Sequence, residues 1–453
     1  MRTDRRQFIG VSAAALALTR PAVSQQDPWT AVPAILRRIK APVFPKRDFN
    51  ITAFGAVADG KKDCTQAIAS AITECNRRGG GRVVIPPGIV STAAIHLKSN
   101  VNLFVSKGAT LRFLRDPKHY LPLVYTRWEG TECMNYSPFL YADSQENIAI
   151  TGEGTLDGNC DAQNWWNWAS RTGGANQGDA RKRLVEMGAN DVPVKDRVFG
   201  EGSYLRPNFI QPCHSRNVLI EGVTIINSPM WEVNPVLCSN VIVRGVKIAS
   251  HGPNNDGCDP DSCRDVLIEN CTFDTGDDCI AIKSGRNRDG RRVAAPTENV
   301  IIRNCQMKDG HGGVTIGSEM SGGVRNVFAE KCNLSSPHLN QALRFKTNAM
   351  RGGVIENIHF RNMEIGEIAD AVLQIDFNYE EGHNGPELPT VRNISLRDVT
   401  CKKSKYALNL RGFAEAPIRN VRLDHCRFDQ VAQANVVEHV EELVMNQVEV
   451  GGK

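Results

Sequence analysis

A nine-residue pattern of apolar and polar positions recurs through the second half of the chain. Each copy starts with Asn or Asp and carries apolar residues at its second, fourth, seventh and ninth positions. A period of two within each half predicts two short strands separated by a kink. The copies are NVLIEGVTI from 217, NVIVRGVKI from 240, DVLIENCTF from 265, NVIIRNCQM from 299, NVFAEKCNL from 326, NIHFRNMEI from 357, NISLRDVTC from 393 and NVRLDHCRF from 420.

The spacing of these copies indicates the architecture. Successive copies start 23 to 36 residues apart, which is too close for a crossover helix in every interval. Short strands joined by bends and loops of variable length predict an all-β fold, a single-stranded parallel β-helix. The seventh positions then stack as one interior column, where we expect Cys271, Cys305, Cys332 and Cys426 to act as small hydrophobes with free thiols.

Two segments depart from the repeat. In the first, Cys64, Ile68, Ile72 and Cys75 are spaced to share one face of a helix that ends at Gly79. Such an N-terminal helix would cap the open end of the coil, which otherwise exposes its core and strand edges. The second segment, residues 158–210, contains NWWNW and many charged residues. We interpret it as an insertion that is either decoration or the wall of a binding site.

Residues 1–24 have the features of a twin-arginine-type signal peptide. They combine an arginine pair, an apolar run and a small-residue cleavage site, namely Arg5-Arg6, Phe8–Leu18 and Ala22-Val23-Ser24. The apolar run is too short to span a membrane. We therefore expect export to the periplasm or the medium, and a single catalytic β-helix domain over residues 25–453.

The charge of the chain argues against two classes of partner. The full chain has a formal net charge of +4, and removal of the four Arg and one Asp in residues 1–24 leaves about +1. No basic run suggests nucleic acid, and no other apolar stretch suggests a membrane. We expect a monomer whose recognition of charge is confined to a local site.

Short carboxylates crowd two neighbouring stretches, NNDGCDPDS at 254–262 and FDTGDDCIAIKSG at 273–285. Asp is a poor strand residue and is costly to bury unpaired, so the crowding needs a reason. Aligning the coils by their interior column places Asp277 over His311. The preceding coil places Asn255 over Asp277 and Asp256 over Asp278.

The coil that follows adds positive charge to the same surface. ALRFKT aligns with CIAIKS and GVTIGS, so Phe345 points inward while Arg344 and Lys346 face outward beside Lys283. One Asp pair alone would more often close a turn than form a site. The shared register of acids, His and cations favours a functional site.

The remaining acids and cysteines of this region receive structural interpretations. We assign Asp259, Asp261 and Asp274 to turns or ladders. Cys258 and Cys279 lie near the acids, but the absence of Cys-x-x-Cys spacing argues against a metal site.

At these residues the chain resembles the polygalacturonases of glycoside hydrolase family 28, over most of residues 45–450. That family's four motifs are Asn-x-Asp, Gly-Asp-Asp, Gly-His-Gly and Arg-x-Lys. They stand here as Asn254-Asn255-Asp256, Gly276-Asp277-Asp278, Gly310-His311-Gly312 and Arg344-Phe345-Lys346. One departure is Asn255, where the family often has Thr or Ser.

The resemblance implies a right-handed, pectin-lyase-like β-helix that hydrolyses α-1,4-galacturonosidic bonds with inversion and without a metal or other cofactor. It implies that Asp277 is the general acid, and that Asp256 and Asp278 activate water. His311 would hold a hydrogen-bond network around the acid. The substrate, a pectic polysaccharide or oligogalacturonide, would be bound by Arg344, Lys346, Lys283, Tyr379 and Asn255.

The motif wording further resembles exo-acting bacterial members of the family. Two segments could close one end of the groove: the insertion, and the loop GRNRDGRRVAAP from 285. Its arginines would either grip a terminal uronate or form a solvated basic loop, namely Arg286, Arg288, Arg291 and Arg292.

Other activities stay open at this stage. They are an endo-polygalacturonase, a hydrolase of rhamnogalacturonan or xylogalacturonan, a calcium-dependent pectate lyase, and a non-catalytic polysaccharide-binding β-helix. The intact Asp256, Asp277 and Asp278 argue against the last of these.

Overall fold

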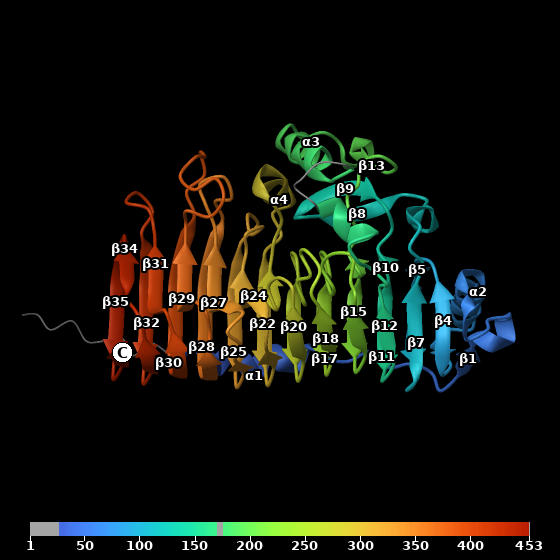
Figure 1. Ribbon diagram of the computed structural model, residues 1–453, viewed down its shortest axis with the longest axis horizontal. Coiled ribbons are helices and arrows are strands. Elements are labelled where there is room, and N and C mark those ends of the chain that lie inside the picture. Colours follow the sequence, from blue (N-terminus) through green and yellow to red (C-terminus); the bar gives the residue numbers. More distant parts are fainter. Residues whose placement is uncertain (1–26, 170–174, 453) are drawn as a thin grey trace, which may run out of the picture.

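The computed structural model describes residues 27–169 and 175–452, and the segment predicted as a signal peptide lies outside these ranges. The chain winds into a parallel β-helix whose coils stack along one long axis (Figure 1). Each coil contributes strands to three parallel ladders, two of which contain the two short strands that the repeat predicts.

The first two ladders contain the two halves of the repeated pattern and form one continuous sheet. The first ladder runs through β1 (Asp48–Asn50), β3 (Gly81–Ile85), β6 (Val101–Val105), β11 (Glu146–Gly152), β15 (Arg216–Glu221), β17 (Ser239–Arg244), β19 (Arg264–Glu269), β22 (Thr297–Arg303), β25 (Val324–Glu330), β28 (Val354–Glu367), β30 (Thr390–Ser404), β32 (Ile418–Asp424) and β35 (Val440–Asn446). The second contains β2 (Asp59–Asp63), β4 (Gly88–Thr92), β7 (Ala109–Phe113), β12 (Thr155–Asp157), β16 (Thr224–Ile226), β18 (Lys247–Ser250), β20 (Thr272–Thr275), β23 (Gln306–Met307), β26 (Asn333–Leu334), β33 (Arg427–Val431) and β36 (Glu449–Gly452), with β28 and β30 spanning both.

The third ladder carries the sequence motifs. Its strands are β5 (Ile95–His96), β10 (Leu140–Asp143), β14 (Ile210–Cys213), β21 (Ile280–Ile282), β24 (Gly310–Ile316), β27 (Leu339–Lys346), β29 (Ala371–Asp376), β31 (Tyr406–Arg411) and β34 (Val436–Glu438). Isolated bridges through Val233 and Cys258 continue the ladder between β14 and β21.

The polar positions of the repeat are explained by backbone conformation. The first and sixth residues of all eight copies have positive φ, for example Asn217 at 57° and Gly222 at 78°. Asn, Asp and Gly tolerate this left-handed region better than other residues. The first-position Asn side chains also donate to one another from coil to coil, as in Asn357 to Asn326 at 3.2 Å. The predicted kink is therefore confirmed, and the asparagines stack as a ladder.

The interior is filled by the apolar columns that the repeat predicts. All eight seventh-position residues are at most 1% exposed. The fourteen cysteines all lie in the described ranges, and each is buried with a free thiol.

Helices cover the start and one face of the solenoid. α2 (Thr65–Arg77) buries Ile68, Ile72 and Cys75 against the first coil, which confirms the predicted cap (Figure 1). The segment before the first coil, including α1 (Val32–Arg38), runs back along the outer face of the first ladder and packs on Leu219 and Ile301. None of the helices in the described ranges has the length and apolarity needed to cross a bilayer.

Additional elements gather over the third ladder at the middle coils (Figure 1). An antiparallel hairpin, β8 (Val124–Trp128) and β9 (Thr131–Asn135), pairs with β13 (Val198–Phe199) of the insertion. α3 (Gly178–Ala189) from the insertion and α4 (Asn287–Val293) from the loop after β21 pack beside this hairpin. These elements stand above the surface on which the motifs lie.

Candidate active site

The four motifs converge because their coils stack in the predicted register. Bridges join Cys258 to Ile280 and Asp261 to Lys283, so Asp256 lies one coil from Asp278. The Asp277 carbonyl accepts from the amide of His311 at 3.1 Å, which places these two residues side by side on the next pair of coils.

The coil after His311 brings in the cations. Thr315 pairs with Arg344 and Ile316 with Phe345, as the sequence alignment predicts. Acids and cations from four successive coils therefore share one surface.

Asp278 lies at the centre of the positive charge. Its side chain is fully buried, and Lys346 Nζ donates to its Oδ2 at 2.6 Å while Arg344 Nη1 donates to its Oδ1 at 3.3 Å. Burial alone would raise the pKa of Asp278, but Lys346 and then Arg344 lower it to about 2. Asp278 is therefore a carboxylate at any pH in which the protein works.

The two cations are less accessible than their outward direction suggests. The Lys346 side chain is only 8% exposed and that of Arg344 17%. Both point away from the coil interior, as expected, but other groups of the site enclose them. Their ion pairs with a buried carboxylate give them a structural role in addition to any contact with substrate.

Asp277 is paired with His311 at the mouth of the site. His311 Nδ1 lies 2.9 Å from Asp277 Oδ1, and this contact raises the pKa of His311. Gly312 explains why a glycine follows the histidine: a Cβ there would lie 2.8 Å from an oxygen of Asp278 and 2.2 Å from the Thr315 hydroxyl. The glycine allows the carboxylate and the histidine strand to approach closely.

Asp256 has the opposite electrostatic surroundings to Asp278. Burial, followed by the charges of Asp259 and Asp277, raises the pKa of Asp256 well above its ordinary value, and the Lys283 ammonium opposes this rise. Lys283 Nζ lies 3.7 Å from Asp256 Oδ2. One oxygen from each of Asp256, Asp277 and Asp278 lies within 4.8 Å of the others.

Asn255 occupies a structural position that differs from the expected substrate contact. Its side chain is fully buried: Oδ1 accepts from Ser250 and Gly252, and Nδ2 donates to the carbonyls of Ser228 and Met230. The amide fixes the loop before Asp256, so this expectation was wrong.

Two of the acids assigned to turns or ladders lie beside the site. Asp261 is buried and paired with Arg127 of β8 at 2.8 Å, which anchors the hairpin to the coil. Asp259 is fully buried, and neither of its carboxylate oxygens has a hydrogen-bond partner among the described residues. The sequence does not distinguish these buried acids from ordinary turn residues.

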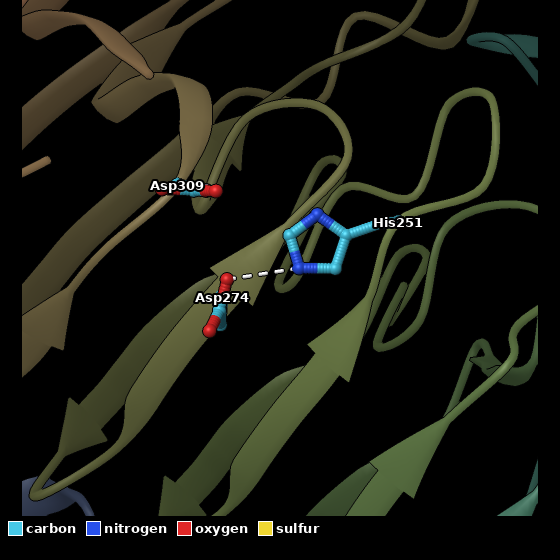
Figure 2. Close-up of side chains that lie close together, drawn as sticks. All are labelled: His251, Asp274 and Asp309. Carbon is cyan, nitrogen blue, oxygen red and sulfur yellow. Dashed lines mark ion pairs between the residues drawn. The ribbon is translucent and has the colours of Figure 1, made fainter. Parts of the chain in front are cut away.

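Asp274, the third of those acids, belongs to a separate cluster. It pairs with His251 at 2.9 Å and lies beside Asp309 (Figure 2). Lys308 Nζ lies 4.0 Å from Asp274, and Asp309 accepts from Ser336. These existing partners, and the exposure of His251, leave the cluster as part of the turn surface.

A pocket of about 580 Å³ opens above the carboxylates. Asp256, Asp277, His311 and Tyr379 line it together with both cations, and Lys346 Nζ lies 5.4 Å from the Tyr379 ring centre. The insertion supplies another part of the lining through Ala169, Asn176, Gln177, Gly178 and Arg181. This lining favours the wall of a binding site over decoration as the interpretation of residues 158–210.

The arginines of the loop after β21, expected either to grip a terminal uronate or to form a solvated basic loop, are held by protein partners. Arg288 pairs with Asp191, Arg292 with Asp289, and Arg291 donates to backbone carbonyls. Arg286 is nearly buried and lies 3.1 Å from Glu129. Among the described residues that line the pocket, none belongs to this loop. Its arginines support the wall through ion pairs.

The pocket also contains residues that sequence reasoning missed. Arg181 Nε lies 2.6 Å from Glu129 in the hairpin turn, and its Nη2 lies 3.4 Å from Glu380 after β29. Trp231 and Glu319 contact Lys283. The NYEEG sequence around Glu380 gave a weak signal, but the hairpin and insertion have no repeat from which their position can be predicted.

The arrangement has the chemistry of glycosidic bond hydrolysis. A carboxyl group with a histidine partner lies next to two further carboxylates, and fixed cations border the same pocket. A pair of Asp or Glu groups flanking a sugar bond is the standard requirement for this reaction. Lys283 lies beside Asp256, and Arg344 and Lys346 contact Asp278, so protein cations lie against two of the three carboxylates.

Comparisons with known proteins agree with this chemistry. The model of glycosyl hydrolases family 28 matches residues 200–443. A hyperthermoactive exopolygalacturonase from Thermotoga maritima is 43% identical in sequence, with 93% of this chain and 96% of that chain covered and a TM-score of 0.90.

Curated relatives are more distant. A "Probable polygalacturonase" of Vitis vinifera is 28% identical over 86% of this chain and 75% of its own length. An endo-polygalacturonase of Pectobacterium carotovorum is 26% identical over 79% of this chain and 84% of its own length. These matches confirm the predicted right-handed β-helix and glycoside hydrolase activity, and the chain belongs to glycosyl hydrolases family 28.

Proposed function

We propose that this hydrolase cleaves α-1,4-galacturonosidic bonds of polygalacturonate. One observation carries the proposal: Asp256 and Asp277 line the same pocket as the cations Arg344 and Lys346. Both cations also contact Asp278, the third carboxylate of the cluster. A neutral sugar would not require two fixed cations, whereas a uronate carboxylate forms charge-assisted hydrogen bonds with them. Tyr379 beside these cations offers a ring face for a sugar.

In this proposal Asp277 is the general acid. It is the most accessible of the three carboxyl groups, and its partner His311 orients it and lies at the mouth of the pocket. Asp256 and Asp278 activate the attacking water from the deeper side. Replacement of Asp277 by Asn removes the proton donor and keeps the shape, so hydrolysis should fall by roughly 10²- to 10⁴-fold.

We further propose that hydrolysis inverts the anomeric configuration, an inference that depends on the family resemblance. Inverting sites usually separate their carboxyl groups by about 6.5–9.5 Å to admit water. The closest oxygens of Asp256, Asp277 and Asp278 lie within 4.8 Å of one another, so their spacing is not the basis for proposing inversion. Proton NMR of the first products tests it directly. Initial release of the α-anomer would show retention and exclude the proposed roles.

Exo action is supported by the walls of the pocket. The hairpin and the insertion arise from coils before Asp256, while Glu380 arises from a coil after Lys346. Arg181 connects these sides through its ion pairs, which restricts the groove around the acids. The Thermotoga maritima relative is named an exopolygalacturonase, whereas the Pectobacterium relative is named an endo enzyme.

The mode of attack is tested by following viscosity and reducing ends together on de-esterified polygalacturonate. Exo action releases monomer or short units while viscosity falls slowly. A rapid fall in viscosity with a ladder of mid-sized products would show internal cleavage. Parallel digests of xylogalacturonan and rhamnogalacturonan test the other pectic substrates.

A lyase is distinguished by its product and its metal requirement. Elimination would give an unsaturated product and would depend on calcium. We expect saturated products and unchanged activity after chelation. The substrate, and the export signal proposed for residues 1–24, support action in the periplasm or outside the cell.

A further inference from the structure

Lys283 lies at the wall of the pocket but has little freedom to bind a ligand. Its side chain is only 2% exposed, and its Nζ lies 3.2 Å from Glu319 Oε2 and 3.7 Å from Asp256 Oδ2. The ammonium also lies 4.2 Å from the ring centre of Trp231. Three sides of the ammonium are therefore occupied by protein groups.

Asp256 needs a cation because acids surround it. Asp259 lies in its own loop, and Asp277 and Asp278 lie in the next coil. The backbone amide of Glu232, in the preceding coil, donates to the Asp256 carbonyl at 2.9 Å. The Oδ1 of Asp256 has no hydrogen-bond partner among the described residues. A buried carboxyl group in such surroundings is stabilised in its protonated form.

The other cations near Asp256 are held elsewhere. Arg344 and Lys346 contact Asp278. Arg206, which faces Asp256 from the insertion side, is buried and donates to Gln177, Pro229, Pro253 and Asn254. Glu319, on the far side of Lys283, is itself 3.6 Å from Arg286. Lys283 is the cation that the geometry directs at Asp256.

We propose that Lys283 is a positioning residue that opposes protonation of Asp256, and that it does not bind the uronate group of the substrate. The proposal rests on the proposed function, in which Asp256 accepts a proton from the attacking water. A protonated Asp256 cannot do so. Burial lowers the pKa of Lys283, but Glu319, Asp259 and Asp256 raise it well above its ordinary value, so the ammonium stays charged across the working range.

The test is the pH dependence of kcat/KM in Lys283→Gln. An opposite charge within about 4–6 Å lowers a carboxyl pKa by about 1–3 units. Removal of the Lys283 charge should therefore move the acidic limb of the kcat/KM profile to higher pH by about 1–3 units, and activity should recover above the new limb. Lys283→Arg, which keeps the charge, should leave the limb within about half a unit even if kcat falls. Lys308→Met, which removes a lysine outside the pocket, should leave the profile unchanged.

Two outcomes separate this inference from the proposed function. If folded Lys283→Gln loses activity by the same factor at every pH through a higher KM, Lys283 binds substrate and the inference is overturned. Circular dichroism verifies that each variant is folded. If Lys283→Gln does not fold, Lys283→Arg becomes the test, and a shift of its acidic limb by more than about half a pH unit overturns the inference. Near-normal turnover by Asp256→Asn would instead remove Asp256 from the reaction, which refutes the proposed function whatever Lys283 does.

Discussion

Replacement of Lys346 by Met should destabilise the protein as well as inactivate it. Methionine keeps the length of the stem and removes the ammonium that donates to Asp278 at 2.6 Å. Asp278 is fully buried, so the variant leaves a buried carboxylate with only the longer contact to Arg344 at 3.3 Å. Breaking a buried ion pair by removing one partner costs about 3–5 kcal/mol.

The pKa of Asp278 gives a second measure of the same loss. It lies at about 2 in the folded protein against an ordinary value of 3.8. A shift of roughly two units corresponds to about 2–3 kcal/mol of stability at neutral pH. Since Arg344 remains beside Asp278, we expect the free energy of unfolding to fall by about 3 kcal/mol, the lower end of the range for a broken buried ion pair. For a chain of this length, that corresponds to a fall in Tm of about 3 °C.

The sign of the pH dependence follows from the lowered pKa. A carboxyl group whose folded pKa is depressed contributes stability above its unfolded pKa, and this contribution is lost as pH falls through its folded pKa. The difference in Tm between the wild type and Lys346→Met should therefore be full above about pH 5 and shrink towards pH 2. Scanning calorimetry across this range measures it.

Two matched variants make the test specific. Asp278→Asn combined with Lys346→Met removes both charges and should recover most of the lost stability. Lys308→Met removes a half-exposed lysine 4.0 Å from Asp274 and should change Tm by less than about 1 °C. The reasoning is refuted if Lys346→Met has the wild-type Tm at neutral pH, or if the double variant is no more stable than the single one.

Three further predictions concern separate parts of the molecule. Asp277→Asn should keep its Tm and lose roughly 10²- to 10⁴-fold in kcat on polygalacturonate, and near-normal turnover would exclude Asp277 as the acid. Arg181→Ala should leave Tm within about 1 °C, because its ion pairs are partly exposed, but should increase mid-sized products and speed the fall in viscosity; an unchanged product pattern would count against exo control by the wall. Glu232→Gln should stabilise the protein above about pH 5. Burial raises the pKa of Glu232, so wild-type stability falls as pH rises from its unfolded pKa of 4.5 towards the folded value, and a constant difference in Tm across pH would contradict this.

The solenoid could be predicted from sequence because several independent positions of the repeat recur once in every coil. The first and sixth positions require positive φ, the second and fourth fill the core, and the seventh forms the interior column. Every coil repeats these requirements, so a single alignment predicts the register of distant motifs. The convergence of Asp256, Asp277, His311 and Arg344 followed from that register.

A signal for the N-terminal segment was present at the third position of the repeat. Leu219, Ile242, Leu267, Ile301 and Phe328 are apolar although they face outward. The next copies carry His, Ser and Arg at that position. An outward apolar column that stops abruptly indicates a covering segment.

The walls of the pocket could not be predicted in the same way. The hairpin, the insertion and the loop after β29 occur once each, so no repeat aligns them with the coils. Their positions depend on side-chain pairs between residues far apart in sequence, such as Arg127 with Asp261 and Arg197 with Asp289 at 2.9 Å. Charge in the sequence of the 285 loop suggested ligand binding, whereas the folded chain places acidic partners beside it.

The protonation states of the site also depend on the folded register rather than on local sequence. Asp256 and Asp278 lie one coil apart and are equally buried, yet Asp278 receives two cations from the coil of β27, and Asp256 receives only Lys283, at a longer distance. The same stacking that brings the acids together therefore separates their proton affinities. The difference makes Asp256 the stronger base of the two, so a proton taken from the attacking water has one preferred acceptor.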